Sequence, residues 1–275
     1  MSPAITTDVL GTVLTSQPAL FQDVAANTSL SASFWVNIPL AGFSILLFIY
    51  MGRNVEDPRT QLIFVATMMV PLVSISSYTG LVSGLTVSYV NVPYPGGGSE
   101  EVLLMWGRYL TWALSTPMIL VALGLLAGSN ITKIFTAVVT DIGMCVTGLA
   151  AALTTSSLLL RWFWYVISCA FFVAVLYILL VEWPDDARVA GTSEIFSTLK
   201  TLTVVLWLGY PIFWALGSEG LAFLTTAQTS WAYSILDIGA KYLFAYLLLR
   251  WVAANESIVG DVGSGQLGVA TSADD

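Results

Sequence analysis

The sequence predicts an all-α membrane protein, built as a single bundle of seven transmembrane helices. Of its 275 residues, 57% are apolar and only 9% are charged, whereas soluble domains carry about 25% charged residues. Seven apolar segments reach the roughly 20 residues that a helix needs to cross a bilayer. These segments show no alternation of period two, so the strands of a membrane β-barrel are disfavoured.

Short links separate the seven predicted helices. The helices are expected over residues 31–51, 61–87, 103–127, 132–153, 158–181, 197–219 and 229–252. Trp183-Pro184-Asp185-Asp186 is expected to open the link between the fifth and sixth helices. The longest link, Ser88–Glu101, contains a run of three glycines between Val- and Tyr-rich flanks, which predicts a small β-hairpin on the membrane surface.

The basic residues predict how the bundle is oriented. If the seven spans alternate, one side collects five Lys and Arg residues, and the other side has only Arg161 near a helix end. The five are Arg53, Arg59, Lys133, Arg188 and Arg250. Because cytoplasmic loops carry the excess of basic residues, the N-terminus is predicted outside the cell and the C-terminus in the cytoplasm.

This orientation divides the chain into three regions of a multi-pass plasma-membrane protein. Residues 1–29 are expected to form an extracellular polar tail, mostly disordered, residues 30–253 the seven-helix domain, and residues 254–275 a cytoplasmic acidic tail. The net charge of −8 disfavours nucleic-acid binding, and the absence of histidine disfavours a zinc or haem site. No metal site is expected.

Asp237 and Lys241 lie in the middle of the seventh predicted helix. Their spacing of four places carboxylate and amine on one helix face. A charge at the bilayer centre costs about 2.5–3.5 kcal/mol even on the lenient insertion scale, so this pair needs a reason. One interpretation is an ion pair that only packs the bundle. The other is a lysine kept dry for covalent chemistry with a carbonyl compound, beside its counter-ion.

The third helix carries a cation followed by hydroxyl groups on one face. Arg108, Thr111, Trp112 and Ser115 are spaced i, i+3, i+4 and i+7. Taken alone, Arg108 could be an arginine that snorkels to the interface. The hydroxyls continuing the stripe inward favour a site for an anion that sheds its water.

The sixth helix carries an aromatic face interrupted by Pro211. Trp207, Tyr210 and Trp214 share this face, and the proline predicts a kink. Helix packing alone would also produce such a stripe. Together with aromatic residues of other helices, it predicts a slot walled by flat rings, suited to a long planar apolar ligand.

These motifs resemble the signature of the archaeal retinal proteins. The resemblance rests on Arg108-Tyr109-x-x-Trp112-x-x-x-Thr116-Pro117, on Trp207-x-x-Tyr210-Pro211-x-x-Trp214 and on Asp237-x-x-x-Lys241, and it extends over the whole seven-helix region. Within that family the chain is most similar to the halorhodopsins, which are light-driven chloride pumps. The runs Trp106–Leu126 and Asp141–Leu149 support this closer match.

The resemblance implies a covalently bound chromophore. All-trans retinal would be attached to Lys241 as a protonated Schiff base, with Asp237 as part of its counter-ion, hydrogen-bonded by Tyr78 and Tyr210. The remaining implied pocket residues are Trp112, Thr116, Met144, Tyr165, Ser168, Trp207, Pro211 and Trp214. Arg108, Thr111 and Ser115 would bind chloride, and Thr203 and Lys200 resemble residues on the release side. For Lys200, a role as a solvated surface lysine remains an alternative.

The transported ion is predicted from charge. Proton pumps of the family carry carboxylates where this chain has Thr111 and Ala122. A protonated Schiff base and Arg108 contribute two positive charges against the single negative charge of Asp237. A buried excess charge is expensive, and a bound chloride would compensate it. The chain is therefore predicted to be a transporter and not an enzyme, moving chloride inward when light isomerises the retinal.

Two rival functions agree less well with these residues. A sensory (phototaxis) rhodopsin would signal through a partner transducer, but such relatives usually keep an acid at the place of Thr111. A seven-helix receptor or transporter without retinal would leave Lys241 unexplained. As partners, the resemblance implies chloride and other small anions, membrane lipid, a homotrimer and a carotenoid.

Overall fold

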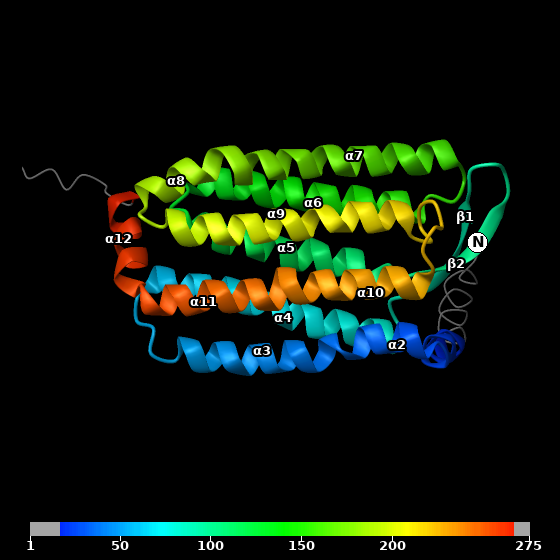
Figure 1. Ribbon diagram of the computed structural model, residues 1–275, viewed down its shortest axis with the longest axis horizontal. Coiled ribbons are helices and arrows are strands. Elements are labelled where there is room, and N and C mark those ends of the chain that lie inside the picture. Colours follow the sequence, from blue (N-terminus) through cyan, green and yellow to red (C-terminus); the bar gives the residue numbers. More distant parts are fainter. Residues whose placement is uncertain (1–16, 267–275) are drawn as a thin grey trace, which may run out of the picture.

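The computed structural model describes residues 17–266, with side chains described through residue 262. Within this part of the chain, seven helical stretches are long and apolar enough to cross a membrane, which confirms the predicted fold class (Figure 1). They comprise Thr28–Gly52, Pro58–Val82, Gly107–Leu126, Ile131–Leu153, Leu158–Val189, Ser193–Leu216 and Thr226–Ala254.

Several of these spans are built from more than one element. In chain order, the elements are α2 (Thr28–Trp35), α3 (Asn37–Gly52), α4 (Pro58–Val82), β1 (Ser88–Pro93), β2 (Ser99–Leu104), α5 (Gly107–Leu126), α6 (Ile131–Leu153), α7 (Leu158–Tyr177), η1 (Ile178–Glu182), α8 (Trp183–Val189), α9 (Ser193–Leu216), α10 (Thr226–Asp237), η2 (Ile238–Leu243), α11 (Phe244–Ala254) and α12 (Glu256–Gln266). The elements η1 and η2 are π-helical segments within otherwise α-helical spans.

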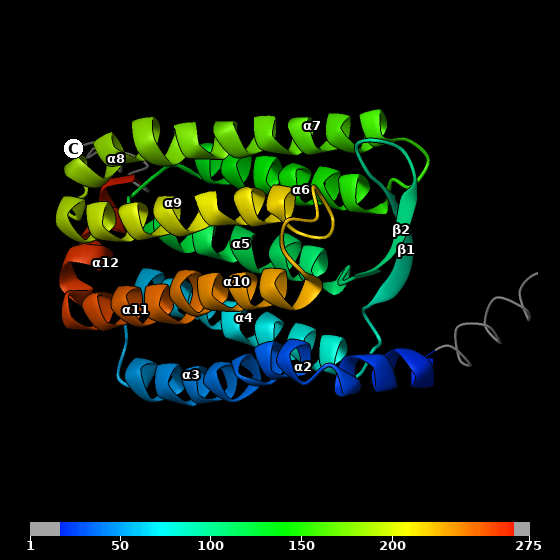
Figure 2. The same ribbon diagram turned by 45° about the vertical axis from the view of Figure 1, so that its right-hand side comes forward.

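The spans run side by side along the long axis of the molecule (Figures 1 and 2). The strands β1 and β2 lie at one end of the bundle, which we call the hairpin end. The helix α12 lies across the opposite end, which we call the α12 end. Large apolar side chains such as Phe43, Leu46 and Phe135 remain more than 60% exposed on the described surface, as expected where a bundle faces lipid.

Polar side chains cap the helix starts that follow the links. Asp57 accepts a hydrogen bond from the Thr60 backbone N–H at 2.6 Å, and Asn130 accepts one from Lys133 at 2.9 Å. These oxygens satisfy donors that the first helical turn leaves unpaired. The caps set where α4 and α6 begin.

The predicted hairpin is confirmed. The strands β1 and β2 pair antiparallel, with Ser88 opposite Leu104 and Pro93 opposite Ser99. Gly96, Gly97 and Gly98 in the turn all have positive φ angles, between 91° and 99°, where a side chain would be strained. The glycine run is therefore what allows the chain to reverse here.

The expected start of the link after the fifth helix is wrong. The helix does not end before Trp183-Pro184 but continues through η1 and α8 to Val189. Pro184 lies in the first turn of α8, directly after η1, a position where a residue without an N–H is tolerated. The buried indole of Trp183 holds this extension against the core.

The N-terminal segment is also more ordered than expected. Residues 17–26 are helical, and the side chain of Val24 is fully buried against Tyr78, Leu81 and Met105. At Gly84, whose φ is +73°, a Cβ atom would lie 2.7 Å from the Phe21 backbone nitrogen. This segment therefore packs closely on the hairpin end of the bundle, while residues 1–16 of the expected tail lie outside the described part.

Candidate functional site

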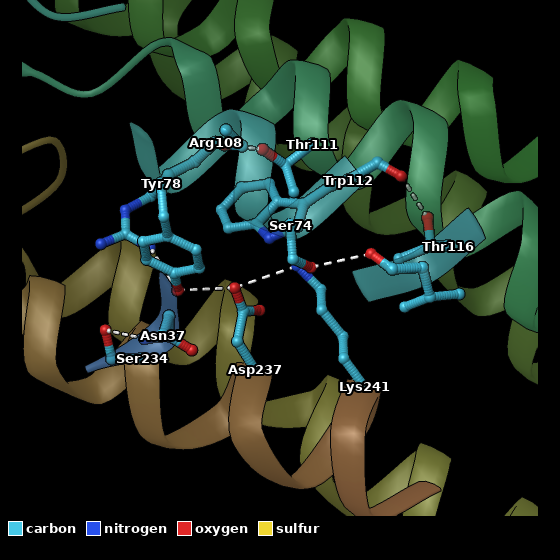
Figure 3. Close-up of polar contacts among 12 residues, drawn as sticks. Asn37, Ser74, Tyr78, Arg108, Thr111, Trp112, Thr116, Ser234, Asp237 and Lys241 are labelled. Carbon is cyan, nitrogen blue, oxygen red and sulfur yellow. Dashed lines mark hydrogen bonds and ion pairs between the residues drawn. The ribbon is translucent and has the colours of Figure 1, made fainter. Parts of the chain in front are cut away.

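Lys241 and Asp237 form a buried ion pair in the middle of the last span. The Nζ atom of Lys241 lies 3.0 Å from Oδ2 of Asp237, and the two side chains are 1% and 2% exposed. Lys241 belongs to η2, where the backbone leaves the regular α-helix. Gly239 allows α9 to approach here, since a Cβ atom would lie 2.8 Å from Leu206 Cδ1. Figure 3 shows the lysine side chain reaching toward α5.

Two tyrosines fix the carboxylate of Asp237. The Tyr78 hydroxyl donates to Oδ2 at 2.7 Å (Figure 3). The Tyr210 hydroxyl donates to Oδ1 at 2.6 Å. Both hydrogen bonds are those that the family resemblance implies. Since both oxygens are engaged, the negative charge of Asp237 is held at one place beside the amine.

Arg108 lies inside the bundle and does not snorkel. Its side chain is 3% exposed, and Nη2 donates to Ser230 Oγ at 2.7 Å. The guanidinium also lies over the rings of Phe34, Tyr78 and Tyr233, with its carbon 5.3–5.6 Å from their centroids. No carboxylate of the described residues forms an ion pair with it.

Two donors near this arginine and along its helix face have no partner among the described residues. They are Nε of Arg108 and the hydroxyl of Ser115, both fully buried. The Thr111 hydroxyl differs, because it bonds the Gly107 carbonyl at 2.9 Å and also contacts Ser77. Buried donors are normally satisfied, so each of these two atoms is a candidate partner for a bound acceptor.

A cavity opens between α5, α6, α7 and α9. The space between the surrounding atoms, open solvent at its mouth included, amounts to about 690 Å³. Its walls contain nine predicted pocket residues: Trp112, Thr116, Met144, Tyr165, Ser168, Trp207, Tyr210, Pro211 and Trp214. They also contain five that the sequence interpretation missed: Tyr109, Cys145, Gly148, Cys169 and Phe172.

The missed wall residues have a simple signal. Tyr109, Trp112 and Thr116 are spaced i, i+3 and i+7, so α5 presents a second inward face beside the Arg108 face. Cys145 directly follows Met144, a residue predicted to line the pocket. The second face turns toward α6, where Thr116 donates to Asp141 Oδ2 at 2.6 Å.

The rings of the cavity are held by polar contacts at their edges. Tyr165 stacks on Trp214 with centroids 4.7 Å apart, and its hydroxyl donates to the Pro211 carbonyl at 3.0 Å. The Ser168 hydroxyl donates to the Met144 carbonyl at 2.8 Å. The cavity wall is therefore apolar and rigid, which suits a flat apolar ligand.

A polar cluster closes the cavity at the hairpin end. The Trp214 Nε1–H donates to the Tyr109 hydroxyl at 2.7 Å, and that hydroxyl donates to the buried carboxyl of Glu219. Arg161 donates through Nε and Nη2 to the Glu219 backbone carbonyl at 2.8 and 2.6 Å. Burial raises the pKa of the Glu219 carboxyl, although Tyr109 and Arg161 oppose this shift.

The expected release-side residues lie apart from this site, on α9 toward the α12 end. Thr203 is 1% exposed, and its hydroxyl has no partner among the described residues. Lys200, one turn earlier, is half-buried. Neither contacts the Asp237–Lys241 pair through a described hydrogen bond.

Comparison with known proteins decides the family. A family model described as "Bacteriorhodopsin-like protein" matches residues 28–255. The chain belongs to the bacteriorhodopsin-like family. Among its relatives, the halorhodopsin of Halobacterium sp. (strain SG1) is 72% identical over 265 residues, covering 94% of this chain and 93% of the relative. The halorhodopsin of Halorubrum sodomense is 73% identical over 251 residues, 91% of this chain and 89% of the relative.

Solved structures of this bacteriorhodopsin-like family agree. One described as "Halorhodopsin, a light-driven chloride pump" has a TM-score of 0.83 and 61% identity, covering 85% of this chain and 99% of that chain. The bromide-bound form of halorhodopsin from Halobacterium salinarum gives the same TM-score with 60% identity, covering 86% and 99%.

The residues of the site are suited to bind retinal. The ring-walled cavity offers an apolar space, and Tyr210 in its wall bonds Asp237, the partner of Lys241. Lys241 carries the only fully buried amine of the described residues. A carbonyl compound can react with such an amine. The residues present therefore suit a covalently attached, flat apolar chromophore.

Proposed function

We propose that this protein is a light-driven pump that moves chloride inward across the cell membrane. The observation that carries the proposal is the uncompensated positive charge at the site. Lys241 and Arg108 are buried, and among the described residues Asp237 is the one carboxylate bonded to either of them. Thr111 stands where proton pumps of the family carry an acid. The high identity to halorhodopsins supports the same function.

The chain's own residues divide the work. Lys241 would hold the retinal, Asp237 would compensate one positive charge, and Tyr78 and Tyr210 would keep its carboxylate in place. When bound, retinal supplies visible absorption and a light-driven isomerisation. The cavity of aromatic side chains would confine the polyene and exclude water.

Chloride is the transported substrate. Arg108, Thr111 and Ser115 would bind it, with the unpaired donors of Arg108 and Ser115 replacing part of its hydration shell. Its path inward would lead past Thr203 and Lys200 toward the α12 end. This direction follows from placing the hairpin end outside the cell, which the basic residues at the α12 end support.

A chloride titration tests the anion site. The pigment reconstituted with all-trans retinal is expected to change its absorption maximum as sodium chloride replaces sodium sulfate. In illuminated cells, inward chloride movement should draw protons inward and make the medium alkaline, more so with a protonophore. A chloride-insensitive colour, or acidification that a protonophore abolishes, would contradict the proposal.

A second experiment tests the attachment residue. Borohydride reduction of the pigment should fix retinal to the protein, and mass spectrometry of the fragments should place the added mass on Lys241. Recovery of that mass on Lys200 or Lys133 would overturn the assignment. Because it does not depend on transport, this result stands apart from the chloride titration.

The assembly proposed for the protein follows its relatives. We infer a homotrimer in contact with membrane lipid and a carotenoid, and transport of other small anions beside chloride. A cross-linking ladder ending at three protomers in native membranes would support the trimer. A sensory role through a transducer is not favoured, because this chain has Thr111 where sensory relatives usually keep an acid.

A further inference from the structure

The buried cation Arg108 is oriented by a serine from the last span. Its shortest described side-chain hydrogen bond goes from Nη2 to Ser230 Oγ at 2.7 Å. The contact of Nη1 with the Tyr78 hydroxyl is much longer, at 3.5 Å. Ser230 is fully buried in α10, so water does not compete for this bond.

Ser230 is in turn held by Ser33 of the first span. The two Oγ atoms are 2.6 Å apart, and the Ser33 hydroxyl donates to the Leu30 carbonyl at 2.6 Å. Each hydroxyl has one hydrogen to donate. Since Ser33 uses its hydrogen on Leu30, Ser230 must donate to Ser33, and its free lone pairs face Arg108. The hydrogen bonds therefore run in one direction, from Arg108 through both serines to a carbonyl.

The backbone of Ser33 is also held in place. The Ser33 backbone carbonyl accepts Asn37 Nδ2 at 3.2 Å and Ser234 Oγ at 2.5 Å. The first span breaks at Val36, between α2 and α3, next to this carbonyl. Ser33 thus has little freedom to turn its hydroxyl away from Ser230.

We propose that Ser230, oriented by Ser33, is a positioning residue that sets the guanidinium of Arg108 for chloride. A serine acceptor fixes the guanidinium without neutralising it, whereas a carboxylate at the same place would form an ion pair and take over the charge that the anion needs. The inference rests on the proposed chloride site and names two residues outside it.

Single and double substitutions test the direction of the chain of hydrogen bonds. Ser230→Ala is expected to raise the chloride Kd, measured by the shift in absorption maximum, about tenfold, as expected for losing one hydrogen bond to a charged group. Ser33→Ala should raise it less, and the Ser33→Ala/Ser230→Ala double variant should match Ser230→Ala alone. Ser230→Thr should bind chloride nearly as well as the unchanged protein.

The matched control is Ser44→Ala. Ser44 belongs to the same first span, and its hydroxyl also bonds a carbonyl one turn back, that of Leu40 at 2.7 Å. The chloride Kd of the Ser44→Ala pigment should equal that of the unchanged protein. Provided that the unchanged pigment responds to chloride, three outcomes would overturn the inference. Ser230→Ala could bind chloride as well as the unchanged protein, or Ser230→Thr could bind it as weakly as Ser230→Ala. The third is that the losses of chloride affinity caused by Ser33→Ala and Ser230→Ala add in the double variant. A pigment whose colour ignores chloride would instead refute the proposed function.

Discussion

At the scale of single residues, the site depends on which buried polar atoms have partners. Both carboxylate oxygens of Asp237 accept hydrogen bonds, so its side chain is held in place while it compensates one positive charge. Arg108 Nε and Ser115 Oγ remain unpaired among the described atoms. The two hydroxyls on this face of α5 therefore differ: Thr111 is hydrogen-bonded and Ser115 is not. They should contribute differently to anion binding.

Ser115 is expected to matter more than Thr111 for chloride affinity. Ser115→Ala should weaken chloride binding about tenfold, because its free donor is lost. Thr111→Val should change the affinity less, because that hydroxyl already bonds the Gly107 carbonyl and contacts Ser77. Chloride titration of the two pigments compares them directly. Equal losses in both variants would show that the pairing of Thr111 is exchanged on binding.

Glu219 should give the folded protein a pH dependence. Burial raises its carboxyl pKa, so the folded chain keeps a proton that the unfolded chain loses at an ordinary carboxyl pKa of about 4.3. Its contribution to stability is therefore lost as the pH rises from that value through the raised pKa. Glu219→Gln should flatten this part of the pH profile of the thermal midpoint. Glu101→Gln, in the exposed part of the hairpin, is the control and should leave the profile unchanged.

At the scale of elements, glycines decide how closely the links approach the helices. At Gly107, the first residue of α5, a Cβ atom would lie 2.5 Å from the Cβ of Thr86 in the preceding link. Arg108 directly follows Gly107 in the first turn of α5. The close packing of Thr86 on Gly107 therefore also helps to position the Arg108 side chain inside the bundle.

Gly107→Ala is expected to destabilise the protein by about 1–3 kcal/mol, the usual cost of forcing extra volume into a packed site. Gly42→Ala is the matched control within a helix, because a Cβ atom there lies an ordinary 3.8 Å from Ile75 Cδ1. That control should be neutral or stabilising, since alanine is the better helix former by about 1 kcal/mol. Thermal midpoints of the two variants, read from visible absorption, test the contrast.

At the scale of the whole molecule, the two ends of the bundle are closed by different devices. Residues 17–26 and the β1–β2 hairpin cover one end, where Tyr89 donates to Asp23 at 3.0 Å. At the other end, α12 packs on the bundle through the buried side chain of Val259. The carboxylate of Glu256 accepts hydrogen bonds from the backbone N–H groups of Glu56, at 2.7 Å, and Asp57. The helix α12 therefore belongs to the packed structure.

Val259→Ala should lower the free energy of unfolding by about 1–3 kcal/mol, because it removes buried apolar atoms and leaves a cavity. Asp185→Ala is a suitable comparison at the same end. Its ion pair with Arg188 joins side chains that are 71% and 75% exposed, and such pairs contribute little. A Val259→Ala midpoint no lower than that of Asp185→Ala would show that α12 does not stabilise the bundle.

Composition and residue spacing are enough to predict the seven spans, the hairpin, the Asp237–Lys241 pair and the faces of α5 and α9. These features follow from composition and from spacing along one helix, which a single chain displays directly. The same spacing also contained a missed signal, since Ser230, Ser234, Asp237 and Lys241 share one face of the last span.

Which groups meet across helices becomes visible only in the three-dimensional structure. It paired Ser33 with Ser230, engaged Thr111 locally, left Ser115 unpaired and carried the fifth helix on to Val189. The physical reason is that a contact between helices depends on the rotation and depth of each one in the bundle. Those are set by the packing of all seven spans together and by no spacing within one of them.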